Sequence, residues 1–277
     1  MKHLLVPIDF SNDSLNALEF AIMLANQMKY DVRLIHVKRK NADYDPSFDL
    51  KDFDEVLKSG IEENFDKIIN EFCIKLKGGI DYRIREGRVY KEICNQAKYA
   101  DAEMIVMGTH GVSGFEEKWV GSNAFRVVSS SSCPVLTLRY NFPKRPIKKI
   151  ILPIDTSNET RLKVPFLASV ANIFKAEIHL VDVCNNNRIK TRKILNEYSE
   201  QVINYLKNQN IDFVRESLRG NNISESIIEY ALLNDADLIG IQIEPTQKPL
   251  NIWLEAYAQQ MVNHSPIPVL SLKCVQK

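Results

Sequence analysis

The chain carries one series of short motifs twice, in the same order. LLVPIDFS at 4–11 recurs as IILPIDTS at 150–157, and DVRLIHV at 31–37 recurs as EIHLVDV at 177–183, each pair 146 residues apart. DAEMIVM and CPVLTL then recur as DADLIGI and IPVLSL, 134 residues apart. A repeat that keeps the order of its motifs predicts two copies of one structural unit. A length of 277 residues suits two domains of ordinary size.

Each copy alternates short apolar, β-branched runs with amphipathic stretches, a pattern typical of β-α-β units on a largely parallel sheet. We therefore predict an α/β fold of two tandem domains, each an open, mostly parallel five-stranded sheet flanked by helices. In the first copy, strands are expected near 3–8, 31–37, 80–85, 103–107 and 134–138, and helices from Ser11 or Asp13 to about Met28 and over 54–77, 89–99 and 121–131. In the second copy, strands are expected near 149–154, 177–183, 211–217, 237–242 and 267–272.

The change of offset places twelve extra residues in the first copy, between its second and third strands. The segment 38–57 in this region is rich in Asp and Asn and contains Pro46, which favours a loop. The segment 139–148, RYNFPKRPIK, holds two prolines and reads as the linker between the copies. We place the two domains at 1–141 and 146–277.

The charges and cysteines of the chain exclude several classes of protein. Lys and Arg number 36 against 35 Asp and Glu, so no strong field of one sign favours a nucleic acid or a membrane surface as partner. The five cysteines are scattered without metal-ligand spacing, which argues against a zinc site and a disulfide framework. The N-terminus opens with a strand-like run and holds no apolar stretch long enough for a signal or membrane helix. We expect a cytoplasmic protein with reduced thiols.

A glycine-rich segment follows the fourth predicted strand of the first copy. Gly108, Gly111, Gly121 and Ser122 have the spacing G-x2-G-x9-G-S at a junction between strand and helix. Glycines let backbone amides approach phosphate oxygens, and the N-terminus of a helix favours an anion. The alternative is that Gly108 and Gly111 only form a tight turn, as short glycine patterns often do.

Asp9 ends the first predicted strand as Gly108 ends the fourth. Ligands of open parallel sheets lie at the carboxyl ends of strands where the strand order reverses, so the two residues would face one crevice if their strands are neighbours. Asp9 could then bind a ribose hydroxyl or a magnesium ion. Alternatively, Asp9 only caps the first helix, and its repeat Asp155 favours this interpretation because it persists without the glycines.

These motifs resemble those of the universal stress proteins, whose ATP-binding members show G-x2-G-x9-G-[S/T] after the fourth strand and an Asp after the first. The resemblance spans nearly the whole chain and implies two Rossmann-like domains of the adenine nucleotide alpha hydrolase-like type. It implies ATP, or AMP or ADP, as the ligand, with Mg²⁺ as a candidate ion. It also implies that the two copies pair through their last strands as an intramolecular pseudo-dimer, and a homodimer is a further candidate assembly. The implied adenosine-binding residues are Pro7, Ile8, Asp9 and the main chain of Val37; the implied phosphate-binding residues are Gly108, Gly111, Gly121 and Ser122, with Met107 and Asn123 beside them. Gly87 matches a glycine that closes the pocket, although the proline that follows it in the family is absent here.

The second copy lacks the glycine pattern. A carboxylate at the start of the helix would repel phosphate, and a proline removes an amide donor, so we expect this copy to have lost the phosphate site. The residues at the matching positions are Gln242 for Gly108, Pro245 for Gly111, Glu255 for Gly121 and Ala256 for Ser122.

Neither copy shows a catalytic constellation. The sequence contains no GxxxxGK[ST] loop and no spacing that singles out a nucleophile with its base, so we assign no catalytic residue and no protein metal site. Three functions remain open: a stress-response regulator that binds an adenine nucleotide, a slow ATPase, and a structural or partner-binding stress protein whose glycine loop stays empty.

Overall fold

The computed structural model describes residues 2–38, 50–109, 122–140, 142–185, 188–220, 222–243 and 252–273, and for 50–57, 122 and 252–256 it describes the backbone alone. The N-terminal half contains β1 (His3–Pro7), α1 (Asn12–Met28), β2 (Asp31–Lys38), α2 (Leu50–Phe72), β3 (Ile80–Glu86), α3 (Val89–Tyr99), β4 (Met104–Gly108), α4 (Ser122–Ser130) and β5 (Val135–Leu138). The C-terminal half contains β6 (Lys149–Ile154), the 3-10 helix η1 (Asn158–Arg161), α5 (Val164–Phe174), β7 (Glu177–Cys184), α6 (Ile189–Asn208), β8 (Phe213–Arg219), α7 (Ile223–Leu233), β9 (Leu238–Ile243), α8 (Ile252–His264) and β10 (Val269–Lys273).

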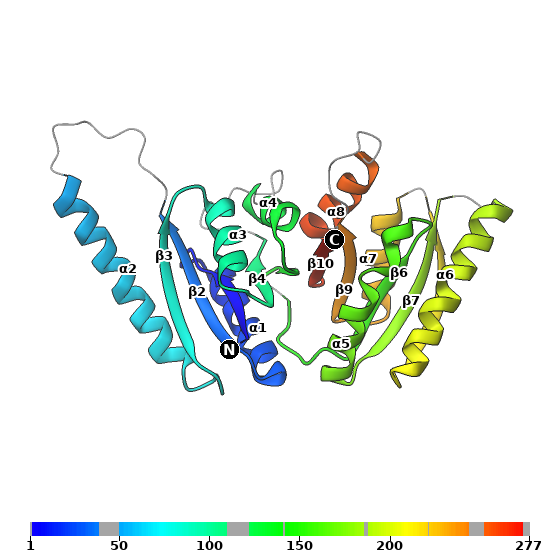
Figure 1. Cartoon of the computed structure of the whole chain (residues 1–277), viewed down its shortest axis with the longest axis horizontal. Helices are drawn as coiled ribbons and strands as arrows, with labels where there is room; N and C mark the ends of the chain where they lie inside the picture. The colour runs from blue at the N-terminus through cyan, green and yellow to red at the C-terminus, as the bar shows by residue number, and fades with distance from the viewer. Residues whose placement is uncertain are drawn as a thin grey trace.

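All ten strands belong to one sheet, in the order β3-β2-β1-β4-β5-β10-β9-β6-β7-β8 (Figure 1). The pairings inside each half are parallel, and the halves join through the antiparallel pair β5 and β10. The predicted α/β fold of two mostly parallel five-stranded units is therefore confirmed. Each predicted strand begins and ends within two residues of the strand in the structure.

The core lies between the sheet and the helices on its two faces. Leu4, Leu5 and Val6 of β1 are fully buried, as are Ile150, Ile151 and Leu152 of β6. α3 and α4 pack together on one face, and α1 contacts β1 and β4 on the other, as right-handed crossovers require (Figure 1). Continuous apolar strands are what a parallel sheet covered on both faces needs.

The predicted helix over 54–77 was placed too late in the chain. α2 begins at Leu50, so the part of 38–57 from Leu50 onward is helical rather than a loop, in keeping with the helical spacing of Leu50, Phe53 and Leu57. α2 ends at Phe72 because the backbone beyond it bonds to α1: the Asn26 side chain donates to the Lys75 carbonyl (2.8 Å) and accepts from the Lys77 amide (2.7 Å). The rest of the predicted loop, 39–49, lies outside the described residues.

The two halves hold each other through their last strands and the helices beside them. Thr137, Leu136 and Val135 pair with Val269, Leu270 and Ser271, which confirms the expected pairing of these strands. The Arg139 guanidinium donates to the Asn263 carbonyl in the last turn of α8 (2.6 Å), and Lys273 Nζ donates to the Ser129 carbonyl in the last turn of α4 (2.9 Å). Each half therefore caps the C-terminus of a helix in the other half.

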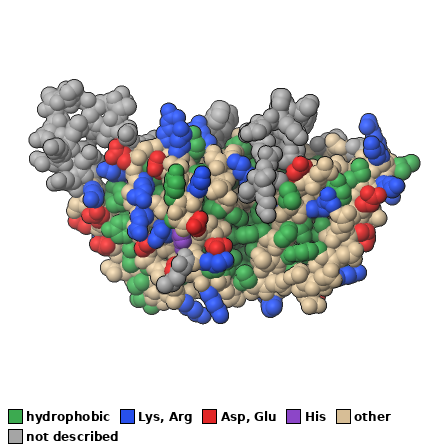
Figure 2. Space-filling model, viewed as in Figure 1, with side chains coloured by type: hydrophobic (Ala, Val, Ile, Leu, Met, Phe, Trp, Pro, Cys, Tyr) green, Lys and Arg blue, Asp and Glu red, His purple; other side chains and the backbone are tan. Residues whose placement is uncertain are grey.

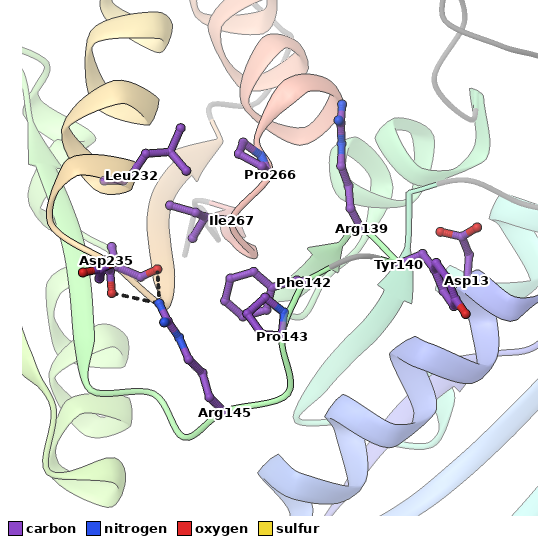
Figure 3. A pocket seen from close by; sticks show the side chains of 12 residues that line it. Asp13, Arg139, Tyr140, Phe142, Pro143, Arg145, Leu232, Asp235, Pro266 and Ile267 are labelled. Carbon is purple, nitrogen blue, oxygen red and sulfur yellow. Dashed lines mark hydrogen bonds between the residues drawn. The ribbon is translucent and has the colours of Figure 1, made fainter.

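The linker is anchored rather than free. Asp237, at the start of β9, accepts from the Arg145 side chain (2.5 Å) and from the amides of Lys148 (2.8 Å) and Lys149 (3.0 Å). Phe142 is buried against Phe20 of α1. Figure 3 shows the resulting cleft between the halves, where Arg145 bonds to the Asp235 carbonyl, and Figure 2 shows hydrophobic side chains along the middle of one face of the molecule.

Candidate functional site

The carboxyl ends of β1 and β4 lie side by side at the point where the strand order reverses. β1 pairs with β2 on one side and with β4 on the other, so the chain leaves β1 in one direction and returns to its opposite edge. Such a switch point is where open α/β sheets bind ligands. The structure thus brings the segment around Asp9 and the end of β4 at Gly108 to one edge of the sheet, as the sequence predicts.

Asp9 holds the turn between β1 and α1. Its Oδ1 accepts from the Ser11 amide (3.1 Å) and from the Ser11 hydroxyl, and the Ser11 hydroxyl in turn caps α1 by accepting from the Ser14 amide (3.2 Å). Asp155 shares the first of these bonds in the other half, where its Oδ1 accepts from the Ser157 amide (2.7 Å), but the Ser157 side chain makes no capping hydrogen bond there. The shared bond gives this carboxylate an architectural role in both halves, and the cap of α1 is Ser11 rather than Asp13.

Gly108 brings β4 against the first turn of α1. A Cβ atom at this position would lie 3.1 Å from both the Cβ and the carbonyl oxygen of Asp13, closer than ordinary van der Waals contact. The absence of a side chain therefore has a packing reason, which the sequence pattern alone did not indicate. It also leaves the main chain at the end of β4 without a covering side chain of its own.

The residues expected around the adenosine lie at the same edge. Ile8 is buried and its amide donates to the Ile35 carbonyl (2.8 Å), Met107 is buried at the end of β4, and Pro7 pairs with Ile35. Gly87 follows β3 with φ of 148°, in a region that favours glycine, and its amide donates to the carbonyl of Lys38 (2.9 Å), next to Val37. The main chain around Gly87 and Val37 is therefore held together at the sheet edge.

Two further side chains stand at this edge that the sequence did not single out for a role. His36 Nδ1 lies 2.7 Å from the carbonyl oxygen of Ile8, and the His36 ring lies 4.9 Å from that of Phe10. Phe10 has a left-handed backbone (φ 64°), which places its ring over β2 against Phe65. A non-glycine residue in this region is uncommon, and no local sequence signal predicts it.

The glycine loop itself is described only in part. Gly111 and Gly121 lie outside the described residues, Ser122 is the first residue of α4, and Asn123 is half-buried in its first turn. The first amides of a helix have no acceptor within that helix, so those at the start of α4 are the groups that a phosphate would meet. Within the described ranges, no group of three or more His, Cys, Asp or Glu side chains could hold a metal ion, and no helix is long and apolar enough to cross a membrane.

Comparison with known proteins decides the family. The model of the universal stress protein family matches residues 1–139 and again 146–273. The chain belongs to the universal stress protein family. Universal stress protein YxiE of Bacillus subtilis is 30% identical over 148 residues, which cover 49% of this chain and 97% of YxiE. Universal stress protein MJ0531 of Methanocaldococcus jannaschii is 32% identical over 149 residues, which cover 50% of this chain and 82% of MJ0531.

The double arrangement has a counterpart among solved structures. A universal stress protein from Archaeoglobus fulgidus superimposes with a TM-score of 0.78 at 18% identity, over 98% of this chain and 96% of that one. A putative universal stress protein from Pseudomonas aeruginosa gives a TM-score of 0.68 at 14% identity, over 99% and 93%. This likeness extends through both halves and concerns the fold.

The second half of this universal stress protein has different chemistry at the equivalent edge. Gln242 stands where Gly108 stands in the first half, and its amide donates to the Leu272 carbonyl (2.8 Å). Tyr257 matches Asn123; burial, and then the nearby Asp155 carboxylate, raise the pKa of its hydroxyl well above the usual range. Lys163 is buried and donates to the Thr160 carbonyl (2.6 Å). The second half therefore carries larger side chains at the positions of Gly108 and Asn123.

Proposed function

We propose that this universal stress protein binds an adenine nucleotide, ATP or its AMP or ADP relatives, in its N-terminal domain (1–141), and that the bound state serves as a regulatory signal in a cytoplasmic stress response. The observation that carries the proposal is the contrast between two equivalent sheet edges in one chain. In the first, Gly108 has no side chain and α4 begins at Ser122. In the second, Gln242 stands at the position of Gly108 and bonds to the Leu272 carbonyl, and the buried Tyr257 stands at the position of Asn123. The C-terminal domain (146–277) is then a partner in a pseudo-dimer without this phosphate site.

Each residue of the proposed site has a distinct task. Pro7, Ile8 and the main chain of Val37 line the adenosine, and Gly87 closes that side of the pocket. Amides of Gly108, Gly111, Gly121 and Ser122 hold the phosphates, with Met107 and Asn123 beside them. Asp9 accepts two hydrogen bonds from Ser11, which fix its carboxylate at the end of β1, and this carboxylate is the group proposed to meet a ribose hydroxyl or Mg²⁺. Phosphate oxygens and water would supply most of the ligands of that ion.

Thermal unfolding with and without Mg-ATP tests the proposal. A ligand at about a hundred times its Kd stabilises the folded state by roughly 2.7 kcal/mol. Gly121→Glu places a carboxylate where phosphate should bind and is expected to abolish the shift while leaving the midpoint without ATP unchanged. Glu255→Gln, at the matching position of the second half, is the control and should retain the full shift.

The same samples distinguish the alternatives. Phosphate release above the level of Gly121→Glu would identify a slow ATPase. If millimolar Mg-ATP, ADP and AMP all leave the unfolding midpoint of the native chain unchanged, nucleotide binding is wrong and a structural or partner-binding role takes its place.

A further inference from the structure

A second cleft lies in the C-terminal half, between the start of α6 and the carboxyl ends of β7 and β8. Its volume is about 520 Å³, within the range of small-molecule sites. It lies at the outer end of the sheet, remote in sheet order from β1 and β4 (Figure 1). Charged and polar side chains from all three elements line it, among them Asp182 of β7, Arg192 of α6 and Arg215 of β8.

The floor of this cleft is an ion pair between the buried Asp182 and the half-buried Arg215. The Asp182 carboxylate accepts from Arg215 Nε (3.1 Å) and Nη2 (2.8 Å) and from the Ser199 hydroxyl of α6. Arg215 also donates to Asn196 (3.1 Å) and Glu200 (3.0 Å). The charge of Asp182 is therefore neutralised from within the protein, and the guanidinium of Arg215 is fixed in place.

The first half has an aromatic cluster at the same place. His36 stands where Asp182 stands, and the strand registers match Arg215 to Tyr82, whose ring stacks on Phe65 of α2 at 4.5 Å. Since apolar packing fills this position in one copy, the fold does not require an ion pair there. Burying charge gives little net stability compared with apolar packing, so the polar floor of the second copy calls for a functional reason.

Three cations line the cleft, and the described part of the chain offers none of them an ion-pair partner. Arg192 and Lys193 come from the first turns of α6, and Arg219 is the last residue of β8. Among the residues that the structure describes, none of these three side chains forms an ion pair or a hydrogen bond with any other residue. The first turn of α6 contains no acidic residue either. Like charges that line one cleft repel each other, and an anion would relieve this repulsion.

We propose that this cleft is a binding site for a small phosphorylated molecule with at least two negative charges. Arg192, Lys193 and Arg219 would neutralise the phosphate, and Asn196 and Ser217 would donate hydrogen bonds. The exposed side chain of Ile189 at the rim offers apolar contact to the organic part of the ligand. The site is separate from the nucleotide site of the first half and does not depend on it.

Pyrophosphate titration in the Gly121→Glu background tests this site alone, because that variant removes the proposed phosphate loop. We expect saturable binding by calorimetry, with sulfate at equal ionic strength as reference. Arg192→Gln and Arg219→Gln should each weaken binding about tenfold, the effect of losing one charged hydrogen bond. Lys207→Gln, in the last turn of α6 and away from the cleft, is the matched control and should change affinity less than twofold.

Thiol labelling supplies an independent readout. Cys184 lines the cleft and Cys73 is exposed elsewhere, so saturating pyrophosphate should slow the reaction of Cys184 with N-ethylmaleimide and leave that of Cys73 unchanged. Absence of saturable binding, or equal losses in Lys207→Gln and Arg219→Gln, would overturn the proposal. Because both measurements use Gly121→Glu, neither outcome bears on nucleotide binding in the first half.

Discussion

Lys273 offers a direct test of how the second half supports the proposed site in the first. Its ammonium group donates to the Ser129 carbonyl at 2.9 Å, in the last turn of α4, and comes from β10 of the other half. α4 spans only nine residues, and its first residue, Ser122, belongs to the predicted phosphate loop. Loss of the cap should therefore loosen the helix whose N-terminus is proposed to hold phosphate.

The size of the effect follows from the geometry. A cation at the C-terminus of a helix contributes about 0.3–1 kcal/mol when exposed and up to about 2 kcal/mol when partly buried, as Lys273 is. We expect Lys273→Met to lower the free energy of unfolding by about 1–2 kcal/mol, which for a chain of this size lowers Tm by roughly 2–4 °C. If ordering of α4 accompanies ATP binding, the same loss applies to binding and the Kd for Mg-ATP should rise about 5–30-fold.

The chain supplies its own control. Arg139 makes the equivalent contact to the Asn263 carbonyl in α8, in the half without the glycine loop. Chemical unfolding and ATP titration of both variants should show a loss of stability for Arg139→Met but an unchanged Kd, and Lys273→Arg should restore both quantities. An ATP affinity that falls equally in Lys273→Met and Arg139→Met, or in neither, would refute the coupling through α4.

Three other predictions concern stability. Gly240→Ala should destabilise the protein by about 1–3 kcal/mol in urea unfolding, since the new Cβ would lie 2.2 Å from Cδ1 of the buried Leu167. Gly60→Ala, inside α2 with no atom within 4 Å of the new Cβ, should instead stabilise by about 0.5–1 kcal/mol; a loss there would contradict the helix assignment. Burial, and then the charge of Cys133, raise the pKa of the Cys94 thiol from 9.0 to about 11. Its contribution to the free energy of unfolding is therefore intact below pH 9. Between pH 9 and 11 the thiol ionises in the unfolded chain but not in the folded one, and the free energy of unfolding falls by up to about 1.4 kcal/mol per pH unit. Cys94→Ala should flatten the fall in stability measured between pH 9 and 11, and an unchanged slope would assign it to other groups.

Local sequence patterns predict the strands and most of the helices, but not the contacts between segments that are distant in the sequence. The repeated apolar runs located every strand within two residues, because burial on both faces leaves a clear hydrophobic signature. The helical spacing that begins at Leu50 was present in the sequence, although the nearby Asp, Asn and Pro residues favoured a loop. The role of Asp9 could not be settled by motif alone, and the matching turn at Asp155 shows why: one geometry serves both halves.

Other features depend on three-dimensional proximity. Gly108 fits the glycine motif, yet its approach to Asp13 involves a residue in a distant helix that no spacing rule connects to it. The ion pair of Asp182 and Arg215 could not be predicted from the sequence for the same reason, since the two residues belong to different strands. Their counterparts in the first half, His36 and Tyr82, are aromatic and form no ion pair with each other.

The linker between β5 and β6 makes the pairing of β5 with β10 independent of protein concentration. Strands on separate chains would have to find each other in solution, whereas the short linker keeps these two at a high effective concentration. A half that is covalently retained in this way does not need a nucleotide to remain paired, so the residues at its sheet edge can differ from those of the first half without loss of the assembly. Covalent fusion thereby gives a plain reason why Gln242, Tyr257 and Glu255 can stand where the first half has Gly108, Asn123 and Gly121.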